Sequence, residues 1–126
     1  MHKLDPRSFS EYNHNNSITE WRRFLKLSLL KERKYRSDLT GRSVGDACEM
    51  HEGILPRVVV PKSIWWHFMI FHPYNCFLLR PEEHRPSPPN RELCYKLACE
   101  RYGKPVVDAW IDSLPFKAPI EIPGRY

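Results

Sequence analysis

The chain has no apolar run that approaches the roughly 20 residues needed to span a bilayer. Charged residues interrupt its N-terminal segment, which lacks the apolar core of a secretory signal peptide. Its four cysteines form no Cys-x-x-Cys pair, which argues against both a zinc knuckle and a disulfide framework. These absences predict a soluble cytoplasmic protein without a membrane partner, with buried free thiols at Cys48, Cys76, Cys94 and Cys99.

What the chain does contain suits one small globular domain. Its 126 residues are 41% hydrophobic, enough for a single core but not for two full domains. The formal net charge of +5 is modest, yet basic residues cluster between positions 22 and 36. Such a cluster favours a polyanionic partner, with nucleic acid ahead of an anionic membrane surface. Its members are Arg22, Arg23, Lys26, Lys31, Arg33, Lys34 and Arg36.

The first predicted element is a basic amphipathic helix over residues 17–37. Residues 1–16 hold few apolar anchors, and we expect them to be flexible. Ser17 and Glu20 form a capping box that marks the start of the helix. A buried stripe at helical spacing follows, made of Ile18, Trp21, Leu25 and Leu29. Another face, either solvated or in contact with phosphates, carries Arg22, Arg23 and Lys26.

The middle of the chain is predicted to hold two short strands. The first ends near His51, and the second covers residues 76–79. Residues 58–60 are β-branched and bounded by prolines, which predicts a short extended segment. Residues 63–71 are apolar apart from His67, so periodicity does not decide between helix and strand, and we favour a short helix there.

Prolines and a glycine shape the C-terminal third of the chain. Three prolines shortly after His84 limit any helix at that point to about one turn. Residues 90–114 are predicted to form a helical hairpin, in which Asn90 caps the first helix and Gly103 ends it. Residues 115–126 are expected to form an extended tail.

Residues 46–84 carry polar side chains at motif-like positions in apolar surroundings. The pair His51-Glu52 ends one apolar run, Asn75 opens the next, and His84 follows Asn75 after eight intervening residues. Together these residues resemble the HNH, or ββα-metal, nuclease motif. In that family a two-stranded ribbon and a short helix wrap one divalent metal ion.

The resemblance implies an α+β fold within a single domain of residues 17–126. A small ββα-metal core, made of a two-stranded antiparallel ribbon and a short helix, would occupy residues 46–84. The N-terminal helix and the C-terminal helical hairpin would flank this core.

The resemblance also implies roles for the motif residues, with two registers open for the first pair. In one register His51 binds the metal and Glu52 is the general base. In the other, His51 is the base and either Glu52 or Glu49 reaches the metal. Asn75 would orient the base or bind the metal, and His84 would be a metal ligand. Candidate extra ligands are His67 and His72.

Phosphodiester hydrolysis by one metal ion needs a base for water and a cation for the phosphate. Carboxylate and carboxamide oxygens suit magnesium or manganese, so one such ion is the expected cofactor. Many family members also bind a structural zinc through two Cys pairs, but the corresponding places here offer no thiolates, and no structural zinc is expected. Those places hold Ser37, Thr40, Arg80 and Glu83.

The function that the resemblance implies is that of a metal-dependent DNA endonuclease leaving 5′-phosphate and 3′-hydroxyl ends. Compact members of the family are frequent in bacteriophages, which implies a phage origin, action in the host cytoplasm, and a phage or host protein as a further partner. One alternative is a catalytically degenerate HNH scaffold that binds nucleic acid or protein. A weaker one is a helical adaptor whose basic face binds an acidic protein. Double-stranded or branched DNA would be contacted through Arg22, Arg23, Lys26 and Arg57.

Overall fold

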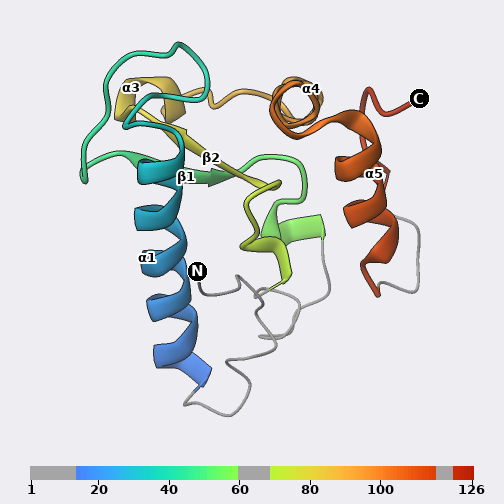
Figure 1. The fold of residues 1–126 in the computed structure, drawn as a ribbon, viewed down its shortest axis with the longest axis horizontal. Coiled ribbons are helices and arrows are strands. Elements are labelled where there is room, and N and C mark those ends of the chain that lie inside the picture. Colours follow the sequence, from blue (N-terminus) through green and yellow to red (C-terminus); the bar gives the residue numbers. More distant parts are fainter. Residues whose placement is uncertain (1–13, 60–68, 116–120) are drawn as a thin grey trace.

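The computed structural model describes residues 14–59, 69–115 and 121–126 of the chain. Helices and two short strands alternate along these residues, which form a mixed α+β fold as the sequence predicts (Figure 1). None of the described helices is long and apolar enough to cross a membrane. The elements are α1 (His14–Glu32), β1 (Glu49–Glu52), the 3₁₀ turn η2 (Arg57–Val59), β2 (Cys76–Leu79), α3 (Pro81–His84), α4 (Arg91–Tyr102) and α5 (Lys104–Ser113).

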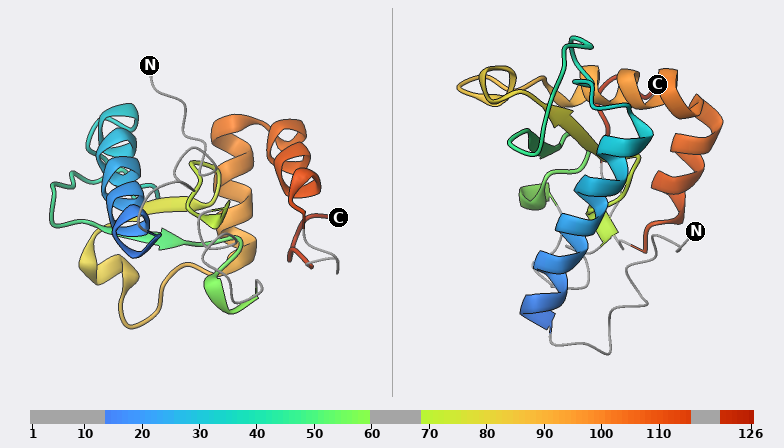
Figure 2. Two further views of the ribbon diagram at one scale, coloured as in Figure 1. Left: turned by 90° about the horizontal axis from the view of Figure 1, so that it is seen from below. Right: turned by 60° about the vertical axis from the view of Figure 1, so that its left-hand side comes forward.

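The two strands form an antiparallel ribbon between α1 on one side of the molecule and the α4–α5 pair on the other (Figure 1). His51 of β1 pairs with Phe77 of β2, and Glu49 pairs with Leu79. All four residues of β2 are buried, whereas three of the four residues of β1 are partly exposed. The turned view shows α1 and the short helix α3 on either side of the ribbon (Figure 2). β2 therefore belongs to the core, and β1 presents side chains to the surface.

Three of the four residues of the predicted stripe of α1 are fully buried in the core, and Ile18 is partly buried beside it. Trp21, Leu25 and Leu29 have no exposed surface. Each such side chain contributes about 1.5–3 kcal/mol when it is fully buried. The indole nitrogen of Trp21 also donates to the backbone carbonyl of Phe71 at 2.8 Å. This hydrogen bond joins α1 to the segment that precedes β2.

α1 begins earlier than the capping box predicts. Its first residue is His14 rather than Ser17, so residues 14–16, which we expected to be flexible, are helical. Residues 1–13 lie outside the described part of the chain. A capping residue is a local preference worth about 1 kcal/mol. Extending an existing helix by a few residues costs little, so this local signal does not fix the helix start.

The other end of α1 also differs from the prediction, since the helix ends at Glu32 and not at residue 37. Lys34 and Tyr35 follow with left-handed φ angles of 57° and 56°, and the amide of Tyr35 donates to the carbonyl of Leu30 at 2.8 Å. Such left-handed residues close a helix. Between them and the helix, Arg33 turns its side chain into the core.

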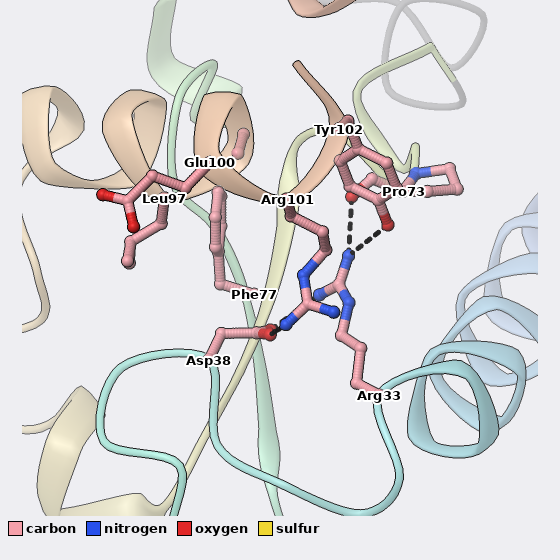
Figure 3. A pocket seen from close by; sticks show the side chains of 9 residues that line it. Arg33, Asp38, Pro73, Phe77, Leu97, Glu100, Arg101 and Tyr102 are labelled. Carbon is pink, nitrogen blue, oxygen red and sulfur yellow. Dashed lines mark hydrogen bonds and ion pairs between the residues drawn. The ribbon is translucent and has the colours of Figure 1, made fainter. Parts of the chain in front are cut away.

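Arg33 takes part in a buried ion pair that joins the end of α1 to α4 (Figure 3). The side chains of Arg33 and Asp38 are 2% and 4% exposed, and their charged atoms lie 2.6 Å apart. Asp38 also accepts from Arg101 at 2.9 Å, and Arg33 donates to the Tyr102 hydroxyl at 3.0 Å. A pocket of ≈ 300 Å³ borders this network. Arg33 also donates to the backbone carbonyls of Cys76 and Pro73 at 2.7 and 2.9 Å, so the network is a structural joint.

The C-terminal helices form the predicted hairpin. The side chain of Asn90 accepts from the amide of Leu93 at 2.8 Å and so caps α4. Gly103 adopts a φ of 96° and separates α4 from α5. Beyond residue 120 the tail returns to α5, where Arg125 pairs with Asp108 at 3.2 Å. The hairpin therefore packs as one unit with the end of the chain.

The segment between the strands departs from the prediction. Residues 58–60 were expected to be extended, but Arg57–Val59 form the 3₁₀ turn η2, whose last amide donates to the carbonyl of Pro56 at 3.0 Å. Val58 is 89% exposed. Without a neighbouring strand, its β-branched side chain gains nothing from an extended backbone. We favoured a short helix over residues 63–71. Most of it, residues 63–68, lies outside the described part of the chain.

A hydrogen-bonded cluster holds α3 through Ser37, Thr40, Arg80 and Glu83, the positions that the sequence analysis compared with the cysteine pairs of HNH nucleases. The carboxylate of Glu83 accepts from the Ser37 hydroxyl at 2.6 Å, from the Thr40 hydroxyl, and from the amide of Arg80 at 2.9 Å. The Ser37 oxygen in turn accepts from the amides of Leu39 and Thr40 at 3.1 and 3.2 Å. We call these residues the Glu83 brace. It ties the loop after α1 to α3 through hydrogen bonds.

Candidate active site

Three side chains converge where β1 meets α3. Glu49 and His51 are two positions apart on β1, so they leave the strand on the same face. His84 is the last residue of α3. Its Nδ1 lies 2.5 Å from Oε1 of Glu49, and its ring centroid lies 4.9 Å from that of His51. The structure thus brings together the two histidines that the resemblance singles out, with Glu49 beside them.

His51 lies beside His84 in surroundings that disfavour its protonation. Burial, followed by the nearby His84, lowers the pKa of His51. His51 is therefore neutral at pH 7 and able to accept a proton.

Glu49 contacts His84, as expected in the register in which His51 is the base and Glu49 reaches the metal. Its Oε1 also accepts from Nε of Arg85 at 3.1 Å. The hydrogen bond with His84, and then the charge of Arg85, lower the pKa of Glu49, which is ionised at pH 7. The sequence analysis did not single out Arg85, and it left Glu49 as one of two carboxylates that could reach the metal. The alternation of Cys48 and Met50, both buried, with Glu49 and His51 could have indicated that Glu49 and His51 share one face of the strand.

Glu52 lies apart from this trio, which corrects the expectation that it converges with His51. Successive side chains of a strand point to opposite faces, so Glu52 leaves β1 on the face opposite to His51. Its Oε1 lies 3.3 Å from Nε of Arg57, and its Oε2 lies 3.7 Å from Nη2 of Arg22. These are its ion pairs within the described residues. The placement argues against the register in which Glu52 is the general base.

Asn75 is fully buried and organises the turn between the strands. Its Oδ1 accepts from the amides of Ile54 and Leu55 at 3.0 and 2.7 Å. Its Nδ2 donates to the carbonyls of Leu55 and Ile70 at 3.0 and 2.8 Å. These four bonds use both donors and both lone pairs of the amide. The amide has no lone pair left for a metal ion, which corrects the expectation that Asn75 is a metal ligand. Its side chain fixes the backbone next to β1, and the role of orienting the base stays a prediction.

A groove of ≈ 630 Å³ runs beside the trio, between α1, the start of β1 and the end of α3. All four predicted nucleic-acid contacts line it, and Arg85 joins them. Glu49 is the one carboxylate in its lining. An excess of positive charge in a groove attracts a polyanion and releases its counterions on binding. The cationic side chains are Arg22, Arg23, Lys26, Arg57 and Arg85.

The other two candidate histidines do not join the site. The ring centroid of His72 lies 4.9 Å from that of Trp110 and 4.5 Å from that of Tyr74, and its Nδ1 accepts from the Tyr74 amide at 3.1 Å. Burial lowers the pKa of His72 to about 4. His72 is thus a packed residue of an aromatic cluster. His67 lies outside the described residues.

Glu49 and His84 are the pair that fits a metal ion. The facing atoms of these two side chains lie 2.5 Å apart. If the side chains moved slightly farther apart, both could bind one ion at the usual ligand distance of roughly 2.0–2.2 Å. No group of three His, Cys, Asp or Glu side chains within the described residues is arranged to hold an ion. Magnesium commonly takes one or two protein ligands and keeps several waters. The donors therefore suit a water-rich site with two protein ligands rather than a closed cage.

Three comparisons with known proteins complete this description. No protein-family model matches the chain, and neither a curated protein nor a solved structure matches it. The functional argument therefore depends on the residues of the groove and of the trio beside it.

Proposed function

We propose that the chain is a metal-dependent DNA endonuclease of the HNH type, which hydrolyses phosphodiester bonds to 5′-phosphate and 3′-hydroxyl ends. The observation that carries the proposal is the convergence of Glu49, His51 and His84 beside a cationic groove. One-metal hydrolysis of a phosphodiester needs a base, a place for the ion and cations that hold the polyanion. The trio and the groove supply groups of each kind.

His51 is the general base in this proposal. It removes a proton from the attacking water, and its lowered pKa leaves the ring neutral and able to accept that proton. Proton transfer of this kind contributes about 10²–10⁴-fold to a rate. His51 is therefore the residue whose loss should slow cleavage most.

Glu49 and His84 are the residues that would hold magnesium or manganese. When bound, the ion acts as a Lewis acid for the phosphate and for the leaving oxygen. Arg85 orients Glu49, and the Glu83 brace fixes the one-turn helix that carries His84. The position of the pair is thus set by groups that do not themselves react.

The groove holds the substrate, duplex or branched DNA, by its phosphates. The first helix contributes three of the cations that line the groove, and they face the same space as Glu49 and His84. This arrangement places the basic face of α1 in the groove, where it would contact phosphates instead of being a merely solvated face. Phosphate contacts of this kind give affinity without sequence preference.

A second candidate function is that of a degenerate HNH scaffold, which binds nucleic acid or protein without catalysis. It is favoured by the hydrogen bond between Glu49 and His84 in a region where no three described side chains form a metal cage. As a permanent pair, these two side chains would only hold α3 against β1. The cationic groove would then be the functional surface.

Plasmid nicking separates the two candidates. We expect the wild type to convert supercoiled plasmid to open circles with magnesium or manganese, and not with EDTA. His51→Ala should lose about a hundredfold or more in rate while DNA binding persists. His84→Ala should raise the required metal concentration by roughly tenfold or more. Glu82→Gln is the matched control, since its side chain is 56% exposed on the same helix.

A wild type that cleaves no supercoiled, linear, branched or single-stranded DNA with either metal would contradict the enzyme proposal. Retained DNA binding in that case would support the scaffold. Equal activity of the wild type and His51→Ala would contradict the assignment of His51 as the general base.

A further inference from the structure

Arg22 of α1 and Arg57 of η2 reach one spot from different segments of the chain. Their guanidinium carbons lie 5.0 and 5.1 Å from the ring centroid of Phe71. Both arginines also pair with Glu52, at 3.7 and 3.3 Å. Phe71 has no exposed surface, so the two cations cover its ring. One aromatic ring and one carboxylate thus gather two like charges.

This cluster has an uncompensated positive charge on its open side. Glu52 supplies one negative charge for two guanidinium groups. Its side chain is 12% exposed, whereas those of Arg22 and Arg57 are 37% and 48% exposed. The carboxylate therefore lies behind the pair, and the cations face the groove. Two cations held this closely repel each other, and an anion on the open side would relieve the repulsion.

The pair also has hydrogen-bond donors to spare. Arg57 donates its Nε to Glu52, and within the described residues its two terminal nitrogens have no acceptor. The contact between Nη2 of Arg22 and Oε2 of Glu52, at 3.7 Å, is too long for a hydrogen bond, so this nitrogen can still donate to a ligand. Guanidinium donors form a planar fork that matches two oxygens of a phosphate. The donors and the charge point to the same kind of ligand.

The pair lies beside the trio rather than on it. Glu52 anchors the pair on one face of β1, while Glu49 and His51 leave the strand on the other. Both arginines nevertheless line the same groove as Glu49 and His84. A nucleic-acid strand in the groove would meet the two places with two different phosphates.

We propose that Arg22 and Arg57 together bind one phosphodiester group that neighbours the cleaved one, and that Glu52 is the positioning residue of this site. The proposal rests on the proposed function for its substrate, nucleic acid. It makes the substrate a strand with at least two phosphodiester groups, because one group occupies the pair while another meets His51. It also gives Glu52 a role in substrate binding in place of proton transfer.

The salt dependence of DNA binding tests the shared phosphate. Affinity for a fluorescent duplex is measured in EDTA so that no cleavage occurs. The logarithm of the affinity falls linearly with the logarithm of the salt concentration, and the slope is about 0.9 for each phosphate neutralised. Arg22→Gln/Arg57→Gln should therefore flatten the slope by about 0.9, whereas two separate phosphates would give about 1.8. The control is Arg42→Gln/Lys96→Gln, which removes the same charge from exposed positions in the loop after α1 and in α4, outside the groove, and should leave the slope unchanged. A change of about 1.8, or none, would overturn the proposal.

Two further measurements separate this proposal from the proposed function. Arg22→Lys/Arg57→Lys should keep the slope but weaken binding by roughly tenfold, since lysine keeps the charge and loses the fork. Bis(p-nitrophenyl) phosphate has a single phosphodiester group, so Arg22→Gln/Arg57→Gln should lose much less of its hydrolysis rate with this compound than with plasmid DNA. Equal losses with the two substrates would place the arginine pair on the cleaved phosphate and overturn the second site alone. If the salt slopes are as expected but the wild type cleaves no DNA, the proposed function alone is overturned.

Discussion

Glu83 and His84 are neighbours on one short helix, yet their surroundings differ in kind. The carboxylate of Glu83 is enclosed by two hydroxyl groups and a backbone amide. His84 contacts Glu49 at the wall of an open groove. A single turn of helix thus links a closed cluster to an open one. A closed cluster stabilises the fold, whereas an open one has contacts that a ligand can replace.

The partners explain why the two clusters behave differently. Burial alone would raise the pKa of Glu83, but the hydroxyls of Ser37 and Thr40 lower it further than burial raises it. These partners are neutral and belong to the loop that the cluster fixes. Glu49 is held by the imidazole of His84 and the guanidinium of Arg85. Imidazole can instead bind a metal ion, and guanidinium can instead bind a phosphate. Adjacent positions can therefore serve stability and chemistry separately.

The first test separates the two carboxylates by activity. Glu49→Gln should lower plasmid cleavage by at least roughly tenfold at limiting metal, because it removes the charged partner of the ion, and should change the unfolding midpoint little. Glu83→Gln should lower the unfolding midpoint and, because the brace fixes the helix that carries His84, should lower cleavage less than Glu49→Gln does. Nicking assays and urea unfolding of both variants give the measurement. Equal losses of activity in the two variants would remove the contrast.

The contrast extends to the histidines, since His72 is packed against aromatic rings and His51 lies beside His84, which lines the groove. Burial lowers the pKa of His72 to about 4 in the folded protein, below its usual value of 6.5. The folded state therefore resists protonation, and the stability that His72 contributes is complete above pH 6.5 and lost as the pH falls toward 4. The loss should approach about 3 kcal/mol.

Urea unfolding between pH 4 and 7 checks this expectation by difference. His72→Phe keeps an aromatic ring against Trp110 and cannot be protonated, so its stability should vary less with pH than that of the wild type. Parallel curves for the two proteins would show that the pH dependence comes from other groups.

The Glu83 brace should be worth somewhat less. Glu83→Ala leaves the Ser37 and Thr40 hydroxyls without their acceptor, and we expect a loss of about 2 kcal/mol in the free energy of unfolding, since hydrogen bonds to charged groups contribute about 1.5–3 kcal/mol. The pKa of Glu83 is lowered in the folded state, so this contribution is lost as the pH falls through the folded value. Glu82→Gln is the control at an exposed position of the same helix.

The smallest expected change replaces the brace by a metal. Ser37 and Thr40, like Arg80 and Glu83, are spaced as in a Cys-x-x-Cys pair, and the hydrogen bonds of Glu83 bring the two pairs together. A variant with cysteine at all four positions should bind zinc tetrahedrally and recover about the 1–2 kcal/mol lost with the brace. Cobalt absorption and zinc-dependent melting measure it. Melting that ignores zinc would show that the pairs do not meet as ligands.

The sequence by itself determined the elements whose ends depend on a few neighbouring residues. Asn90 begins α4 and Gly103 ends it, because a side-chain cap and a left-handed glycine act within one turn. The prolines after His84 confine α3 to a single turn for the same local reason. The period of the apolar stripe in α1 likewise predicted which of its residues are buried.

Only the tertiary structure decided which polar residues meet. Glu49 and Glu52 both flank His51 within β1, and the adjacent pair His51-Glu52 does not reveal which carboxylate faces His84. The burial of Met50 fixes that choice, since it turns Glu52 away from His51 and toward Arg22 and Arg57. Asn75 is committed to the backbone because distant loops converge on it. Contacts between segments far apart in the chain depend on packing, which no local pattern contains.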